Sequence, residues 1–409
     1  MSKLYELIKK FCPDGVEFKK LEECCNILDR KRKPVTKAAR EAGEYPYYGA
    51  NGIQDYVSDY IFDGVFVLVG EDGSVITTGG TPVVNWAEGR IWVNNHAHII
   101  EEREGVLLRY LYHYIQTIDV TQLIHGNIPK LTGGDFKALK IAVPPLEVQH
   151  EIVHILDSFT LLTAELTAEL TARKSQYEFY RDKLLTFSND TLECKLKDIC
   201  DIFLGLTSTP NYIDVGVKFI SAQNTSNDFL DLKNVKYISE TDFENATSNA
   251  KPQRGDLLFT RVGSNLGHPV IVETDEKLCI FVSLGYLRIR NNEKVIIGYL
   301  KHWMNTDLFW SQVRKNVHGA AKVNLNTGWL KEFRISLPPL ETQERIVHVL
   351  DNFEAICTDL NIGLPAEIEA RKKQYEYYRD LLLTYVETGN MLETDRQTDR
   401  QTDRQTERN

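Results

Sequence analysis

The sequence predicts a mixed α+β protein in which two α/β globular domains are separated by two long antiparallel helices that form a coiled-coil spacer, with pseudo-two-fold symmetry from an internal duplication. Two repeated blocks lead to this prediction. PPLEVQHEIVHILDSF at 144–159 returns as PPLETQERIVHVLDNF at 338–353, with eleven of sixteen positions identical, and RKSQYEFYRDKLLTF at 173–187 returns as RKKQYEYYRDLLLTY at 371–385. The blocks keep the same order in both copies, so one structural unit occurs twice.

Composition sets the outer limits. A chain of 409 residues is long enough for two or three domains, and 42% hydrophobic and 26% charged residues are ordinary for a globular protein. No apolar run is long enough for a membrane span, and the N-terminus does not resemble a signal peptide. The seven cysteines include no CxxC pair, which argues against a zinc site and a disulfide framework. We therefore expect a cytoplasmic protein with no membrane contact and no metal.

Strand-like apolar runs separated by turn residues fill two regions, which we expect to be domains at 1–145 and 188–339. The runs are 65–70, 90–100 and 139–143 in the first region, and 218–222, 256–262 and 279–290 in the second. One mostly helical patch precedes the last strand of each region, at 107–118 and 297–313. The two skeletons therefore correspond, which indicates a mixed α/β domain made twice.

The segments 146–187 and 340–389 are expected to be helical arms. Their apolar and aromatic positions alternate in steps of four and three, with Arg173 and Arg371 filling the gaps, which is typical of a heptad seam. The seam residues are Leu166, Leu170, Tyr177, Tyr180 and Leu184 in the first arm, and Leu364, Ile368, Tyr375, Tyr378 and Leu382 in the second. Equal phase favours packing of the arms on each other, while a helical hairpin inside one domain is the alternative.

Two further features distinguish the arms. Gly363 and Pro365 interrupt the second arm, so its long helix is expected to begin near Pro365. The first arm instead runs TAEL twice, at 163–166 and 167–170. Four residues add about 6 Å of helix, so one copy of the repeat would change the spacing of whatever the helix ends hold.

This arrangement resembles the specificity subunit of type I restriction–modification enzymes, over nearly the whole chain. The resemblance rests on two variable regions, each followed by PPLExQxxIVxxLD and then by RKxQYExYRDxLLTF, and on the tandem TAEL repeat. It implies that the globular regions are target recognition domains, each of which reads one half of a split site in double-stranded DNA. It also implies that the arms set the gap between half-sites and dock two S-adenosylmethionine-dependent methylation subunits, in a complex with ATP-dependent restriction and translocase subunits.

The residues agree that chemistry is absent, so we expect no catalytic residue and no cofactor. No GxxxxGK[ST] phosphate loop occurs, and the VPPL and LPPL segments lack the Asn or Asp of a methyltransferase loop. The segment 13–20 places Asp14 and Glu17 too close together for two nuclease strands. His96 and His98 would share a strand face, but no third metal ligand is apparent, so polar packing is the preferred interpretation.

Residues that could read DNA gather in loops before the last strand of each domain and in polar, turn-rich stretches. Groove readout favours Arg or Lys on guanine and Asn or Gln on adenine, with backbone contacts from Ser, Thr and Tyr. The candidates are Tyr47, Tyr48, Asn51, His125, Asn127, Lys130 and Thr132 in the first domain, and Gln223, Asn224, Arg261, Ser264, Asn265, His318, Lys322, Asn324 and Asn326 in the second.

The net charge of −10 is unusual for a DNA-binding protein. However, the two arms and residues 390–409 carry nine of the ten excess negative charges, so the recognition regions are nearly neutral. The tail 390–409 is a charged TDRQ repeat without periodic apolar residues, which predicts disorder. Because Thr-Asp-Arg-Gln can be encoded by a repeated ACAG tetranucleotide, we also expect phase variation at this end of the gene.

Two other functions fit part of the pattern. A stand-alone DNA-binding scaffold or regulator would lack restriction partners, and a purely structural coiled-coil linker would not bind DNA.

Overall fold

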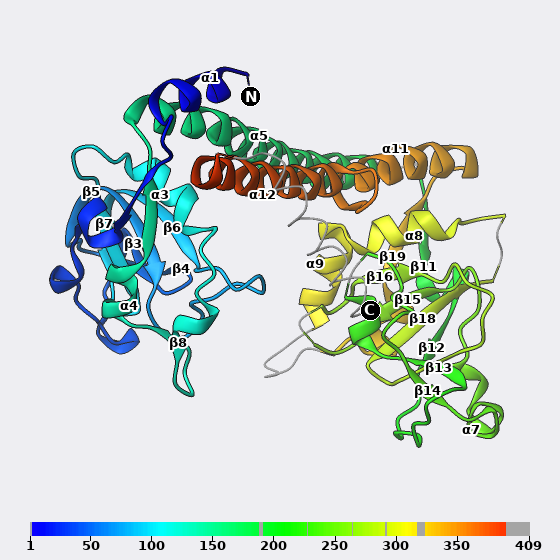
Figure 1. The fold of residues 1–409 in the computed structure, drawn as a ribbon. Coiled ribbons are helices and arrows are strands. Elements are labelled where there is room, and N and C mark those ends of the chain that lie inside the picture. The colour runs from blue at the N-terminus through cyan, green and yellow to red at the C-terminus, as the bar shows by residue number, and fades with distance from the viewer. Residues whose placement is uncertain are drawn as a thin grey trace. The chain divides into compact units, whose positions relative to one another are not determined.

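The computed structural model describes residues 2–187, 191–226, 228–263, 265–290, 293–316 and 324–389. The chain forms two compact units, one of residues 1–165 with 369–409 and one of residues 166–368. Each unit combines strands with helices (Figure 1), which confirms the mixed α+β class. The TDRQ tail lies outside the described residues.

The first unit contains a six-stranded sheet in the order β2-β7-β5-β6-β3-β4 (Figure 1). Its neighbouring strands are antiparallel, except that β3 runs parallel to β6. The strands are β2 (Asn26–Ile27), β3 (Ala42–Gly49), β4 (Gly52–Val57), β5 (Phe62–Gly70), β6 (Val84–Val93) and β7 (Ala97–Glu101). Two smaller pairs are β1 (Glu17–Lys20) with β10 (Lys140–Val143) and the hairpin β8 (Ile124–His125) with β9 (Lys130–Leu131).

Both faces of this sheet are covered, which explains why the middle of β5 is a continuous apolar run. Side chains of a strand alternate between faces, and Val67 and Val69 lie in the main core of the unit while Phe66 and Leu68 lie in a second core. The main core also holds residues of the helices. The helices of the globular part are α1 (Ser2–Phe11), α2 (Leu21–Cys24), α3 (Leu108–Ile115) and α4 (Gly133–Ala138), with 3₁₀ turns at η1 (Asp29–Lys31), η2 (Lys37–Ala39) and η3 (Thr121–Leu123).

The second unit divides its strands among smaller sheets (Figure 1). One has the order β12-β18-β15-β16 and another β14-β13-β17, while β11 pairs with β19. The strands are β11 (Leu192–Lys195), β12 (Cys200–Leu204), β13 (Val217–Ile220), β14 (Lys236–Ile238), β15 (Leu257–Thr260), β16 (Pro269–Ile271), β17 (Leu278–Ile280), β18 (Leu284–Ile289) and β19 (Arg334–Leu337). Its helices are α6 (Leu196–Ile199), α7 (Glu240–Asn245), α8 (Ile297–Met304), α9 (Asp307–Asn316) and α10 (Thr327–Glu332), with η4 (Ala222–Thr225) and η5 (Ser248–Ala250).

Two of the runs expected to be single strands are interrupted. In the run 90–100, β6 ends at Val93 and β7 begins at Ala97, because the side-chain oxygen Oδ1 of Asn94 accepts a hydrogen bond from the backbone amide of His96 at 2.8 Å and closes a turn. The run 279–290 likewise divides into β17 and β18. His96 is therefore a turn residue, and the expectation that it shares a strand face with His98 was wrong.

The duplication extends beyond the blocks that the sequence shows. The Gln of each PPLExQ block is fully buried, and its amide donates to a Pro carbonyl at 2.8 Å, Gln149 to Pro144 and Gln343 to Pro338. The carbonyl oxygen of Gln149 accepts from the Leu107 amide just before α3, and that of Gln343 accepts from the Ile296 amide just before α8. The repeated Gln thus fastens the start of each arm to the helical patch of its own domain.

The arms are long helices, as predicted: α5 (Leu146–Leu184), α11 (Leu340–Thr358) and α12 (Leu364–Thr388). The second arm is broken between α11 and α12, where Gly363 and Pro365 were expected to interrupt it. In the first unit α12 runs antiparallel to the first half of α5 (Figure 1), and Tyr378 stacks on Phe159 with ring centroids 5.2 Å apart. In the second unit Tyr180 of α5 stacks on Phe353 of α11 at 5.9 Å.

The seam residues have two kinds of surroundings. Leu166, Ile368 and Leu382 are buried apolar side chains, whereas Tyr177 and Tyr375 direct their hydroxyls at histidines of the globular domains. Among the helices that the structure describes, none has both the length and the apolar character that a membrane span needs.

Candidate nucleic-acid interface

A groove of about 530 Å³ lies in the first unit where several loops converge. Polar side chains line it, and two of them, Asn51 and Lys130, are candidates from the sequence. Asn51 is held out at the two-residue β3–β4 turn, which Gly52 closes with a positive φ of 94° that glycine adopts without strain. The other polar lining residues are Gln54, Asp72, Ser74 and His96.

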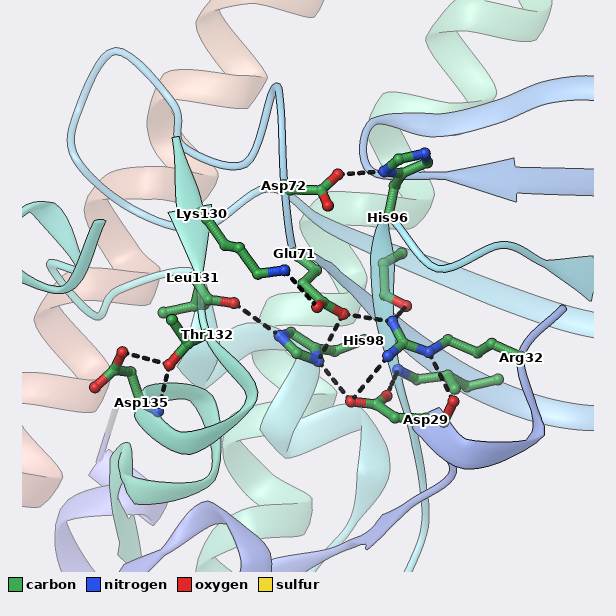
Figure 2. A network of polar contacts seen from close by, with 12 residues as sticks. Asp29, Arg32, Glu71, Asp72, His96, His98, Lys130, Leu131, Thr132 and Asp135 are labelled. Carbon is green, nitrogen blue, oxygen red and sulfur yellow. Dashed lines mark hydrogen bonds and ion pairs between the residues drawn. The ribbon is translucent and has the colours of Figure 1, made fainter. Parts of the chain in front are cut away.

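Lys130 belongs to a network of charges beside this groove (Figure 2). Its ammonium lies 3.2 Å from one oxygen of Glu71, whose other oxygen accepts from the Arg32 guanidinium at 2.7 Å. His96 pairs with Asp72 in the same view. The network therefore joins the β8–β9 hairpin to the loop after β5 and to η1, and it fixes where Lys130 presents its charge.

The buried His98 connects the other half of the network. Its Nδ1 lies 2.6 Å from the Asp29 carboxylate, and its Nε2 donates to the Leu131 carbonyl at 3.1 Å, while its ring stacks on Phe136 with centroids 4.2 Å apart. Burial alone would raise the pKa of Asp29, but the hydrogen bond and charge of His98 hold it below its ordinary value. His98 is thus a packed polar residue, as the sequence favoured.

Asp29, Glu71 and His98 are close enough together to hold a metal ion. However, Arg32 pairs with both carboxylates, at 2.7 Å to Glu71 and 3.5 Å to Asp29, and Lys130 neutralises Glu71 further. A cation would have to displace these two side chains. The geometry is therefore that of a charge-compensated structural network.

The most basic segment of the chain was missed by the sequence reasoning. Residues 30–40, RKRKPVTKAAR, contain six basic and no acidic side chains, and we call this segment the basic strap. Two of its cations fasten it to the domain: Arg32 binds Glu71, and Arg40 binds Asp55 at 3.2 Å. The density of Lys and Arg in one short loop was the signal that could have identified it.

The strap packs against residues of β6 and β3. The Trp92 indole donates to the Lys33 carbonyl at 2.7 Å, the Lys33 amide donates to the Val93 carbonyl, and the Arg40 guanidinium lies 4.1 Å from the centre of the Tyr47 ring. Its four other basic side chains are exposed and form no ion pair with any residue that the structure describes. These are Arg30, Lys31, Lys33 and Lys37.

In the second unit the structure brings three predicted stretches together. The Leu325 amide donates to the Arg261 carbonyl at 3.1 Å, and the Arg261 guanidinium donates to the Leu325 carbonyl at 3.3 Å. The Asn265 amide donates to the Ser226 carbonyl at 3.2 Å. Segments 221–226, 261–265 and 324–326 therefore form one surface, on which Gln223 and Asn324 are exposed.

Several candidates are used inside the fold instead. Tyr47 is almost fully buried, and its hydroxyl exchanges hydrogen bonds with the Val35 backbone, while Tyr48 is buried in the second core. Asn224 donates to the Asp231 and Asn234 carbonyls. Thr132 caps α4 and Asn326 caps α10.

The remaining candidates differ in how much the structure tells of them. Asn127 is exposed at the tip of the β8–β9 hairpin. The His125 backbone pairs with Lys130. The side chain of His125 and the residues Ser264, His318 and Lys322 lie outside the part of the chain that the structure describes.

The comparisons with known proteins agree on one family. The signature of the type I restriction modification DNA specificity domain matches residues 13–173 and again 189–370. A putative type I restriction enzyme specificity subunit of Haemophilus influenzae is 36% identical over 387 residues, which cover 90% of this chain and 96% of that protein. The EcoR124I/EcoR124II specificity subunit of Escherichia coli is 31% identical over 294 residues, which cover 68% of this chain and 71% of the relative.

One solved structure shares the fold. A chain solved in a study of complex assembly and conformational transition of the type I restriction–modification system aligns with a TM-score of 0.52 at 16% identity, covering 91% of this chain and 97% of that one. The two matched sequence segments each contain one copy of the first repeated block, 144–159 in one and 338–353 in the other. The chain therefore belongs to the type I restriction–modification DNA specificity family.

Proposed function

We propose that this chain reads a bipartite site in double-stranded DNA, one half with each globular domain, and leaves methylation and cleavage to partner subunits. Residues 1–145 and 188–339 are the target recognition domains, and residues 146–187 and 340–389 are the spacer arms. The observation that carries the proposal is that each domain gathers polar side chains on one surface: the groove with Asn51 and Lys130 in the first, and the surface of 221–226, 261–265 and 324–326 in the second.

The chemistry of these surfaces suits groove readout. Amide side chains such as Asn51, Gln54 and Gln223 can pair with adenine, and Lys130 can donate to guanine. The Glu71 network holds the Lys130 ammonium in place before DNA arrives, so less conformational freedom is lost on binding. The first domain also supplies contacts to the DNA backbone, because the basic strap carries four exposed cations.

The arms are the docking surface for two methylation subunits, which use S-adenosylmethionine, and the complete complex adds ATP-dependent restriction and translocase subunits. The arms and tail hold nine of the ten excess negative charges. Because DNA phosphates repel negative charge, these segments are better suited to contact protein partners than DNA. We place the complex in the cytoplasm.

Adenine methylation mapped across the source genome tests the proposal. We expect a motif with two specified halves and an unspecified gap of fixed length, and the motif should disappear when this gene is deleted. In parallel, the complex reconstituted with methylation subunits should bind a duplex carrying both halves much more tightly than a duplex with either half scrambled. A methylation motif that persists after the gene is deleted would refute the proposal. If the isolated chain bound DNA and the source genome encoded no methylation or restriction subunits, the stand-alone regulator would be favoured.

A further inference from the structure

A buried histidine in the first unit joins three separate elements. His113 of α3 has no exposed side-chain surface. Its Nε2 lies 2.9 Å from the Asp157 carboxylate of α5, and its Nδ1 lies 2.8 Å from the Tyr375 hydroxyl of α12. A carboxylate accepts and a tyrosine hydroxyl can donate, so the pattern fits the neutral imidazole with its proton on Nε2.

The second unit repeats this arrangement with different residues. His302 of α8 is also fully buried, and its Nε2 lies 2.8 Å from the Asp351 carboxylate of α11. Its Nδ1 lies 3.1 Å from the hydroxyl of Tyr177 in α5. An arginine one turn along the helix lies over each tyrosine ring, Arg379 over Tyr375 at 5.6 Å and Arg181 over Tyr177 at 5.5 Å.

The two sets of contacts use equivalent positions of the two repeats. In each set, residues of both repeats are in contact. Asp157 and Asp351 hold the same position in PPLExQxxIVxxLD, and Tyr177 and Tyr375 hold the same position in RKxQYExYRD. In each unit the histidine and aspartate come from one repeat, whereas the tyrosine comes from the other. Each recognition domain therefore hydrogen-bonds both to the helix that follows it and to a helix of the other copy.

We propose, on the basis of the proposed function, that each recognition domain is held by a positioning lock, which is Tyr375–His113–Asp157 in the first unit and Tyr177–His302–Asp351 in the second. Each lock fixes the orientation of its domain on the helices that it contacts. The two locks together therefore set how strictly the complex discriminates between gap lengths. These six residues touch no DNA base in this role. They act through the domain that they hold.

Burial of the histidine makes the bonded orientation of the domain strongly preferred. The imidazoles of His113 and His302 are fully buried, whereas the side chains of Asp157 and Asp351 remain 39% and 53% exposed. A buried polar group that loses its partner costs more than the bond was worth in water, so the cost of breaking a lock falls mainly on its imidazole. A small rotation of the domain would break two bonds in sequence, so intermediate orientations are disfavoured. Apolar contacts in the same place would allow sliding, because they have no preferred direction.

The chain supplies a matched control for the test. Tyr375→Phe removes one hydroxyl from a lock, whereas Tyr377→Phe removes a hydroxyl from an exposed ring two residues away on the same helix. Tyr177→Phe makes the same change in the second lock, where the residue equivalent to Tyr377 is already Phe179. Each variant is assembled with the methylation subunits and titrated with duplexes whose gap is the natural one or is longer or shorter by a single base pair. Duplexes with one scrambled half-site are titrated in parallel.

We expect both lock variants to lose about tenfold in discrimination between the natural and the altered gaps, the factor that one hydrogen bond of this kind can supply. Discrimination against scrambled half-sites should stay as in the wild type, and Tyr377→Phe should change neither quantity. A merely structural role would lower the melting temperature of the lock variants without changing gap discrimination, and that result would overturn the proposal. If the wild-type complex showed no two-part site at all, the proposed function would fail instead. Should one lock variant not fold, the lock in the other domain still decides.

Discussion

Removing the four exposed cations of the basic strap should weaken DNA binding without changing which sequence is bound. The change is the replacement of Arg30, Lys31, Lys33 and Lys37 by glutamine. Arg32 and Arg40 are kept, because their ion pairs with Glu71 and Asp55 fasten the strap to the domain. The variant therefore tests charge at the strap while its attachment is preserved.

The magnitude follows from counterion release. Each phosphate contact contributes about 0.9 to the slope of log K against log salt concentration. If all four side chains contact phosphates, the slope should become shallower by about 3.6. Raising the salt concentration from about 50 to 200 mM would then cost the variant roughly one hundred times less affinity than it costs the wild type.

The assay is a titration of fluorescent duplex DNA with the assembled methylation complex at a series of salt concentrations. A control variant replaces Lys9, Lys10, Lys137 and Lys140, four exposed lysines of the same unit, and so matches the loss of charge. We expect the control to keep a slope close to that of the wild type, and both variants to keep the wild-type ratio of specific to scrambled-site binding. A strap variant whose slope stays within about one unit of the wild type would refute the reasoning, because fewer than two phosphates would then be contacted.

Three other predictions follow from the same geometry. Deleting Thr167–Leu170 removes one TAEL copy from the continuous helix α5, and the loss of about 6 Å of helix should change the methylated gap by one or two base pairs at about 3.4 Å each. An unchanged gap in methylation sequencing would show that the length of α5 does not set the gap. Gln149→Ala leaves the Leu107 amide and the Gly105 and Pro144 carbonyls without their partner, which should lower the free energy of unfolding by about 3 kcal/mol in urea titrations, whereas the exposed Gln374→Ala should cost almost nothing. Burial lowers the pKa of His113, although Asp157 opposes this. As the pH drops, the unfolded chain therefore takes up the proton before the folded chain does, and stability should fall below about pH 6.5. The melting temperatures of the wild type and of His113→Gln, measured over this range, should converge at the acidic end.

The parts of the fold that sequence could predict are those that repeat or have a clear period. The blocks at 144–159 and 338–353 predicted two equal units, and α5 and α12 follow from the four-and-three spacing of their apolar residues. The same spacing could not show whether the buried face of each helix packs on another helix or on a globular domain. Tyr177 and Tyr375 fit a helix–helix seam as well as they fit a domain contact, and only the distant His302 and His113 decide the matter.

The candidate site was predicted less completely, because exposure in a loop depends on contacts from far along the chain. The stretch around Tyr47 is polar and rich in turn residues, yet Tyr47 is buried because the strap packs across it and Val35 pairs with its hydroxyl. Asn224 has the right chemistry for adenine, but carbonyls seven and ten residues later take its amide protons. Asn51 and Lys130 line the groove because a tight turn and a short hairpin place them there through local contacts alone.

The strap also makes the two recognition domains unequal. In the first domain it follows β2, and the corresponding segment after β12 in the second domain, residues 205–216, contains no Lys or Arg. Phosphate attraction acts over a distance and does not depend on sequence, whereas base contacts require close approach. The first domain should therefore dominate the initial, salt-sensitive encounter with DNA. The second domain must then contribute chiefly through base contacts. The order in which the two domains bind DNA would therefore depend on one loop that differs between the two copies.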